Sequence, residues 1–203
     1  MARRVVNLPN ALTGLRFLLS FVFFLLLRYK GGGWMDLALA LFLVIGLTDI
    51  LDGWLARRWH EETTLGRIAD PFVDKVLVCG AFIFLLAIPE MTRRLPDGAG
   101  LSPWMVMAIA AREFLVTGLR SYAESAGWSF PATWLGKSKM ATQFACLCAA
   151  LIYLGHLEHV AWAHWAMAGF LWLTVGVTVG SCGTYVARFI TLAREEQAQE
   201  QAP

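Results

Sequence analysis

Residues 48–75 read TDILDGWLARRWHEETTLGRIADPFVDK and contain four aspartates in a fixed frame: Asp49, Asp52, Asp70 and Asp74. Reduced to its defining positions, the stretch is D-x-x-D-G-x-x-A-R, eight residues, and then G-x-x-x-D-x-x-x-D. The spacing places the two aspartates of each pair on one face of a helix. Both pairs adjoin strongly apolar stretches, where carboxylates are costly and by default mark a functional site.

Four carboxylates in one pocket would repel one another unless a cation lay between them. Ligation by oxygen alone suits a hard divalent ion, so we expect one or two Mg²⁺ or Mn²⁺ ions. The small residues Gly53 and Ala56 would let a bulky group approach the helix backbone, and Arg57 is near enough to pair with a phosphate. Gly66 is expected to let the connecting loop fold back. The two limbs of the motif, Asp49 with Asp52 and Asp70 with Asp74, would then form one carboxylate site that binds metal ions next to a diphosphate.

The composition is that of an integral membrane protein. Of 203 residues, 58% are hydrophobic and only 16% are charged, whereas soluble domains have about 45–50% apolar and about 25% charged residues. The mean hydropathy is +0.57. This length favours a single membrane domain over residues 1–192, followed by a polar tail, residues 193–203, that we expect to be disordered.

The predicted fold is all-α: a bundle of six transmembrane helices with a polar cavity at the cytoplasmic side. Six apolar stretches approach the roughly twenty residues that a spanning helix needs, and no alternating strand pattern is visible. Asp70 is expected to cap the third helix, with Pro71 in its first turn. The expected spans are residues 11–28, 34–57, 70–89, 101–123, 137–155 and 160–190.

The basic residues predict the orientation. With a cytoplasmic N-terminus, only Arg28, Lys30, Arg93 and Arg94 face outward, and the remaining lysines and arginines lie at or near the inner side. The positive-inside rule favours this arrangement. Both termini and all four aspartates would then be cytoplasmic.

The aspartate frame resembles the signature of the CDP-alcohol phosphotransferase family, integral membrane enzymes of phospholipid synthesis, at every defining position. The family fold is a six-helix bundle, in agreement with the count of spans. The resemblance implies that Asp49, Asp52 and Asp70 bind metal, and that Asp74 is the general base and also contacts a metal. It implies a CDP-binding set consisting of Asn10, Thr13, Asp52, Gly53, Ala56, Arg57 and Gly66.

Three further segments resemble a bacterial branch of this family: NLPNALT at 7–13 with Arg16, AREFLVTGLR at 111–120 and LGKSKMATQ at 135–143. Members of this branch transfer the phosphatidyl group of CDP-diacylglycerol to sn-glycerol 3-phosphate. The resemblance implies these two substrates, membrane lipids as surroundings and the bacterial inner membrane as location. Homodimers are common in the family, and nucleic acid is not an expected partner.

A second set of residues could clamp the phosphate of such an acceptor. Arg112 and Arg120 are eight residues apart and share a helix face, and Glu113 is expected to help neutralise Arg112. The alternative is that these cations only anchor helix ends at the inner side. The candidate acceptor residues are Arg112, Arg120, Lys137, Lys139 and Arg188.

Two other functions stay open at this point. Another transferase of the same family could make phosphatidylinositol phosphate, phosphatidylserine or cardiolipin. An acidic cage could instead serve a cation-binding membrane transporter, although transporters place their sites near the membrane midplane and these aspartates cluster at one face.

Overall fold

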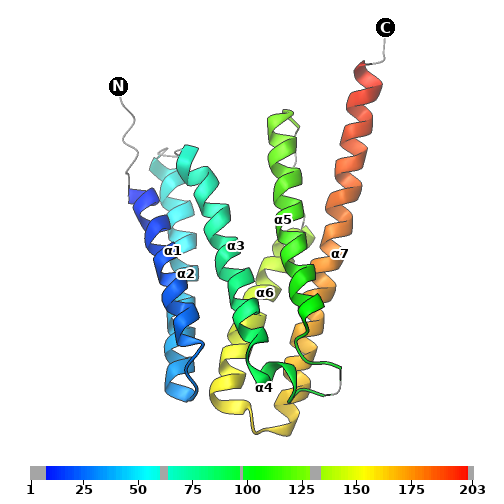
Figure 1. Ribbon diagram of the computed structural model, residues 1–203. Helices are drawn as coiled ribbons and strands as arrows, with labels where there is room; N and C mark the ends of the chain where they lie inside the picture. Colours follow the sequence, from blue (N-terminus) through cyan, green and yellow to red (C-terminus); the bar gives the residue numbers. More distant parts are fainter. Residues whose placement is uncertain (1–7, 60–63, 97, 129–133, 201–203) are drawn as a thin grey trace.

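The computed structural model is a bundle of six long helices in which the start of the first and the end of the last lie on the same side (Figure 1). It describes the backbone of residues 8–59, 64–96, 98–128 and 134–200. It describes the side chains in these ranges except those of residues 8–9, 52–59, 64–68, 135, 137 and 196–200. No strand occurs in the described ranges. The long helices are α1 (Leu8–Leu26), α2 (Gly32–Trp59), α3 (Thr64–Leu86), α5 (Pro103–Ser125), α6 (Trp134–Ile152) and α7 (Ala161–Glu200).

Two short elements lie at the end of the bundle opposite to the chain ends (Figure 1). A four-residue helix, α4 (Pro89–Thr92), follows α3. A π-helical turn, η1 (Tyr153–Leu157), continues α6 before the chain turns into α7.

Three of the helices are long and apolar enough to cross a membrane, which identifies the chain as a membrane protein. Their apolar segments are Gly32–Leu51 on α2, Ser138–Leu157 on α6 and η1, and Ala161–Glu195 on α7, and α1 contains a shorter one. Six long helices do lie at the six predicted positions. That all six cross the membrane stays a prediction, because α3 and α5 carry several charges.

The structure corrects the predicted start of the third helix. α3 begins at Thr64, so Gly66 is helical and Asp70 with Pro71 lies well inside the helix rather than at its first turn. Proline has no N–H to donate and crowds the preceding turn, which is why the sequence predicts a helix start there. Here the helix continues through it, and Asp70 and Asp74 still lie one turn apart.

The structure also differs from the prediction of a disordered tail. α7 continues to Glu200, so most of the segment 193–203 that polarity assigned to a tail is helical. Ala, Glu, Gln and Arg dominate this segment, and all four are strong helix formers. A polar composition is therefore compatible with a helix as well as with a tail, and the domain boundary after residue 192 stays a prediction.

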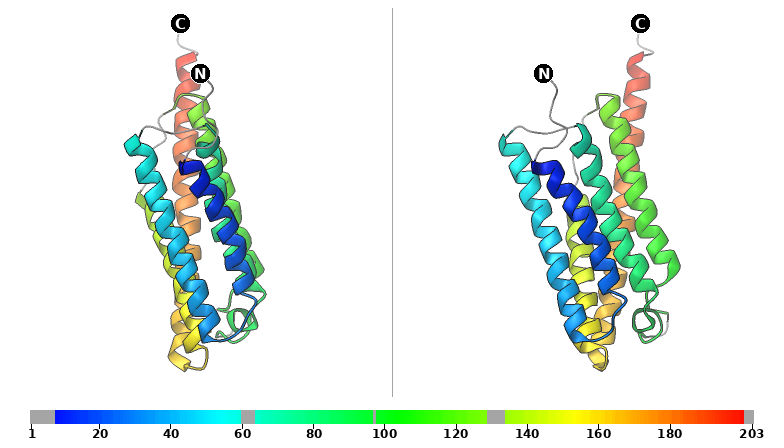
Figure 2. Two further views of the ribbon diagram at one scale, coloured as in Figure 1. Left: turned by 90° about the vertical axis from the view of Figure 1, so that its left-hand side faces the viewer. Right: turned by 60° about the vertical axis from the view of Figure 1, so that its left-hand side comes forward.

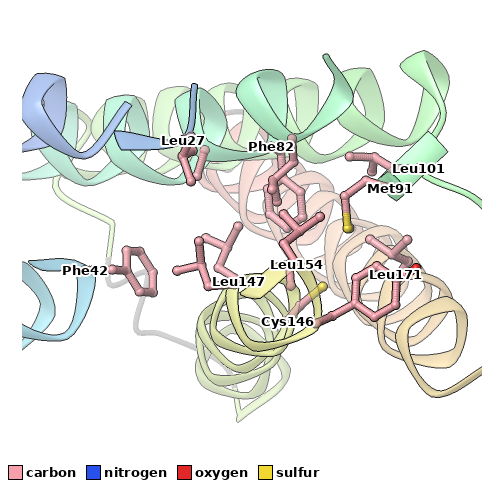
Figure 3. Packing of buried hydrophobic residues seen from close by; sticks show 14 of the residues in the cluster. Leu27, Phe42, Phe82, Met91, Leu101, Cys146, Leu147, Leu154 and Leu171 are labelled. Atoms are coloured by element: carbon pink, nitrogen blue, oxygen red, sulfur yellow. The ribbon is translucent and has the colours of Figure 1, made fainter. Parts of the chain in front are cut away.

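The helices pack in two groups, α1 with α2 and α3, and α7 with α5 and α6. The two groups meet through α3 as well as through α6, because α3 contacts α5 and α6 contacts α2 and α3; Figure 2 shows the same neighbours from two further sides. Figure 3 shows the shared core, where Phe42, Phe82, Leu147 and Leu171 are each at most 1% exposed.

Small residues let two pairs of these helices approach closely. A Cβ atom added to Gly80 on α3 would lie 2.3 Å from the ring of Phe24 on α1, and one on Gly46 of α2 would lie 2.8 Å from Phe144 on α6. Close approach at small residues is typical of helix packing in membranes. The outer surface, by contrast, carries exposed large apolar side chains such as Leu18, Met107 and Trp165, as expected of a surface that faces lipid.

Candidate active site

Two of the four aspartates meet at one arginine. Arg16, buried on α1, forms an ion pair through Nη1 with Oδ1 of Asp49 on α2, and its Nη2 lies 3.5 Å from Oδ1 of Asp70 on α3. The hydroxyl of Thr13, one turn earlier on α1, donates a 2.6 Å hydrogen bond to the same Asp70 oxygen. Three helices thus bring the two limbs of the aspartate motif together.

Sequence reasoning named Arg16 only as part of a family-like segment and gave it no function. The signal that could have found it was its place in the middle of an apolar helix, because a charged side chain there needs a partner. Through its contacts with Asp49 and Asp70 it compensates part of the charge of these two carboxylates.

Asp74 is the third aspartate whose side chain is described. It is half-buried and lies one turn after Asp70 on α3. Among the described side chains, no three carboxylate, imidazole or thiol groups lie close enough together to hold a metal ion. The side chains of Asp52, Ala56 and Arg57 on α2 and of Lys137 on α6 lie outside the described set, and only the helical backbone is described for Gly53 on α2 and Gly66 on α3.

A polar cavity of about 380 Å³ opens between α3, α5, α6 and α7 beside Asp74. Its wall includes Arg112, Arg120 and Lys139, so the predicted phosphate-binding cations of α5 and α6 converge on one space next to the predicted base. Arg188 is exposed on α7 and is not among the residues of this wall. Its assignment to the acceptor site stays a prediction, as does that of Lys137.

The buried carboxylate of Glu113 organises these cations. Its Oε1 accepts hydrogen bonds from Nζ of Lys139 at 2.5 Å and from Nε2 of Gln143 at 3.3 Å, and it lies 3.6 Å from Nη1 of Arg112. The expectation that Glu113 helps to neutralise Arg112 is therefore confirmed, and the same carboxylate also pairs with Lys139. Arg112 also donates through Nε to the hydroxyl of Ser181 on α7, at 3.2 Å.

Tyr185 on α7 is a wall residue that the sequence did not reveal. It is 1% exposed, its ring lies under the Arg112 guanidinium at 5.4 Å, and its hydroxyl is 3.5 Å from Nη2 of Arg120. A Cβ on Gly136 of α6 would lie only 2.2 Å from that hydroxyl, so a glycine is required there. A lone tyrosine in an apolar helix carries no sequence signal that distinguishes it from a core residue.

Removing the Glu113 carboxylate should destabilise the protein. Glu113→Ala leaves Lys139 and Arg112 buried without their shared counter-charge. We expect the free energy of unfolding to fall by about 1–3 kcal/mol, because water from the adjoining cavity can solvate these cations only in part. Thermal unfolding in detergent measures the change. Glu195→Ala, at an exposed glutamate of α7 away from the cavity, is the matched control and should leave the transition in place.

A second cavity, of about 410 Å³, reaches Asp74 from the other side, between α2, α3 and α6. Its walls are mostly apolar, with Leu43, Leu47 and Phe144 among them, and it shares Asp74, Lys139 and Met140 with the polar cavity. Asp74 therefore stands where a polar and an apolar space meet.

A third cavity, of about 300 Å³, lies between α1 and α3 next to the Asp70 contact. Asn10 and Thr13, two residues predicted to bind the nucleotide, line it together with Phe17 and Phe72. Both predicted residues thus lie on the α1 face that approaches the aspartate motif.

Known proteins provide an independent comparison. The chain is 32% identical over 187 residues to a CDP-diacylglycerol–glycerol-3-phosphate 3-phosphatidyltransferase of Escherichia coli K12, covering 89% of this chain and 93% of that protein. A protein of the same name from Bacillus subtilis is 35% identical over 149 residues, which is 73% of this chain and 70% of the relative. The sequence profile described as CDP-alcohol phosphatidyltransferase matches residues 6–179. The chain is therefore a member of the CDP-alcohol phosphatidyltransferase family.

Proposed function

We propose that the protein transfers the phosphatidyl group of CDP-diacylglycerol to the 1-hydroxyl of sn-glycerol 3-phosphate, releasing CMP. The observation that carries this proposal is the position of Asp74 between a polar cavity lined with cations and a mostly apolar one. An enzyme that joins a lipid to a water-soluble phosphate needs these two environments on either side of its reacting group. The names of the relatives and the family membership support the same reaction.

The polar cavity suits the acceptor. Arg112, Arg120 and Lys139 give it cationic walls, and guanidinium groups bind phosphate oxygens in a planar fork while an ammonium acts as a point charge. Glu113 and Tyr185 hold these cations in place through the contacts described above. The acceptor phosphate would lie against the cations, and its free hydroxyl would reach toward Asp74.

The reaction needs one proton acceptor and no covalent intermediate. Asp74 takes the proton of the acceptor hydroxyl, whose oxygen then attacks the phosphorus that carries the diacylglycerol. A new P–O bond forms as the bond to the CMP phosphate breaks, and CMP leaves with the electron pair. The mostly apolar cavity between α2 and α6 would hold the first part of the lipid chains.

The carboxylates fit a divalent metal in their chemistry. Asp49 and Asp70 both contact Arg16, which compensates only part of their charge, and their oxygen donors are those that hard cations prefer. Asp52 on α2 and Asp74 on α3 would complete the ligand set for one or two Mg²⁺ or Mn²⁺ ions. When bound, such ions would polarise the phosphoryl oxygens and neutralise the charge of the departing CMP.

The location follows from the same proposal. Six crossings of the membrane would return the end of α7 to the side on which α1 begins, in line with the shared side of these two ends (Figure 1). The excess of basic residues assigns that side to the cytoplasm, where water-soluble acceptors are available. In a bacterium this is the inner membrane. The expectation of a homodimer stays a prediction.

Two alternatives are separated by the choice of acceptor and by the product. A transferase specific for inositol 1-phosphate, inositol, serine or phosphatidylglycerol would release CMP with that acceptor instead. A cation transporter would release none. Purified protein with CDP-diacylglycerol and Mg²⁺ should release CMP rapidly with glycerol 3-phosphate and slowly with the other four, and equal rates would refute the acceptor assignment.

The two substrates should respond to different substitutions. Arg120→Ala removes a cation of the polar cavity and should raise the KM for glycerol 3-phosphate by about ten- to a hundredfold, the value of a lost charge-assisted contact. Its effect on the KM for CDP-diacylglycerol should be small. Arg57→Ala, on the nucleotide side of the motif, is the matched variant and should do the reverse. Equal effects of both variants on both constants would refute two separate subsites.

A further inference from the structure

A cavity of about 430 Å³ lies at the end of the bundle opposite to the aspartates, where the α1–α2 connection, the end of α3, α4 and η1 meet. This volume is within the range of small-molecule sites. Apolar side chains form much of its wall, Leu27, Met35, Phe84 and Leu154 among them. None of its residues belongs to the reaction proposed above, because Asp74 and the cationic cavity lie near the other end.

One wall residue has a buried oxygen with an unmet hydrogen bond. Glu90 on α4 is 6% exposed, and its Oε1 accepts a 2.9 Å hydrogen bond from Nζ of Lys30. Within the described part of the chain, its other oxygen, Oε2, has no hydrogen-bond partner. A buried carboxylate oxygen without a donor is costly, so a donor from outside the chain would be favourable there.

Charge at this site is of both signs. Arg28 and Lys30 line the cavity together with Glu90 and Glu158. Nη1 of Arg94 lies 3.8 Å from Oε2 of Glu158, so the Glu158 carboxylate already has a cationic partner. Glu90 is therefore the better acceptor for a donor from outside the chain. The hydrogen bond from Lys30 lowers the pKa of the Glu90 carboxyl, so Glu90 is an anion at neutral pH.

We propose that this cavity binds the headgroup of a phospholipid that carries a primary ammonium group. The ammonium would donate to Oε2 of Glu90, and the lipid phosphate would lie near Arg28 and Lys30. The apolar walls would contact the glycerol and the first methylenes of the chains. Choline phospholipids have the same charges but no N–H donor, so they cannot satisfy the Glu90 oxygen.

Native mass spectrometry of the purified full chain in detergent tests the proposal. The probes are phosphatidylethanolamine and phosphatidylcholine with identical acyl chains, and soluble phosphoethanolamine. We expect the ethanolamine lipid to bind about tenfold more tightly than the choline lipid, the scale of one hydrogen bond to a charged group. Equal affinities of the two lipids would overturn the proposal, and equally tight binding of phosphoethanolamine would overturn the assignment to a lipid.

A variant that removes the negative charge of Glu90 tests whether this residue causes the preference for the ethanolamine lipid. Glu90→Gln should abolish the preference for ethanolamine over choline while CMP release, at the other end of the bundle, stays unchanged. Asp36→Asn is the matched control, since Asp36 lies at the same end but pairs with His156 at 2.8 Å and does not line the cavity. It should keep the preference. An unchanged preference in Glu90→Gln would overturn the proposal, and the comparison of lipids on the unaltered protein decides it even if the variant fails to fold.

Discussion

Asp74→Asn should lower kcat by at least about a hundredfold, the lower end of the range for general-base catalysis. The amide keeps the shape of the side chain between the two cavities but cannot accept the proton of the acceptor hydroxyl. Steady-state release of CMP from CDP-diacylglycerol, at saturating glycerol 3-phosphate, measures the loss.

Two controls separate lost chemistry from lost structure. Asp36→Asn removes a carboxylate at the opposite end of the bundle and should leave kcat unchanged. Binding of CDP-diacylglycerol to Asp74→Asn should remain measurable by equilibrium methods. Near-normal turnover in Asp74→Asn would mean that another group is the base.

Removing divalent metal with EDTA should abolish CMP release, and an excess of Mg²⁺ or Mn²⁺ should restore it. Arg16 compensates Asp49 and Asp70, but a single guanidinium cannot neutralise four carboxylates and a diphosphate in one pocket. The thermal unfolding transition should be followed in the same samples, so that a loss of fold is distinguished from a loss of activity. Full activity in EDTA would contradict the metal-binding role of the aspartates.

Much of the fold could be predicted from the sequence because membrane helices are specified by long apolar stretches with polar breaks. The positions of six long helices agree with the prediction, and Arg112 and Arg120 line one cavity, in agreement with the shared helix face that their spacing predicts. These features depend on local sequence and on helix geometry alone.

The predictions differ from the structure where the local sequence is compatible with two backbone conformations. Pro71 predicts a helix start, yet α3 continues through it. The polar residues after Leu192 predict a disordered tail, whereas α7 extends to Glu200. In both places the residues were compatible with a helix end and with a helix interior.

Contacts between distant segments were beyond the sequence. The pairing of Arg16 with Asp49 and Asp70, and the wall formed by Tyr185 against Gly136, join residues from different helices. No periodicity within one helix encodes such contacts, because they depend on how the helices pack. The same holds for the Glu90 cavity, which four separate segments build.

The central claim is that the protein makes a phospholipid from a nucleotide-activated lipid and glycerol 3-phosphate. The most direct test uses purified protein in detergent with CDP-diacylglycerol, Mg²⁺ and glycerol 3-phosphate labelled with ¹⁴C, followed by extraction of lipids. We predict that the label enters a phospholipid that carries two phosphate groups, one from CDP-diacylglycerol and one from glycerol 3-phosphate. The amount of labelled lipid should equal the amount of CMP released. Absence of label from the lipid fraction, with protein that remains folded and metal present, would contradict the account.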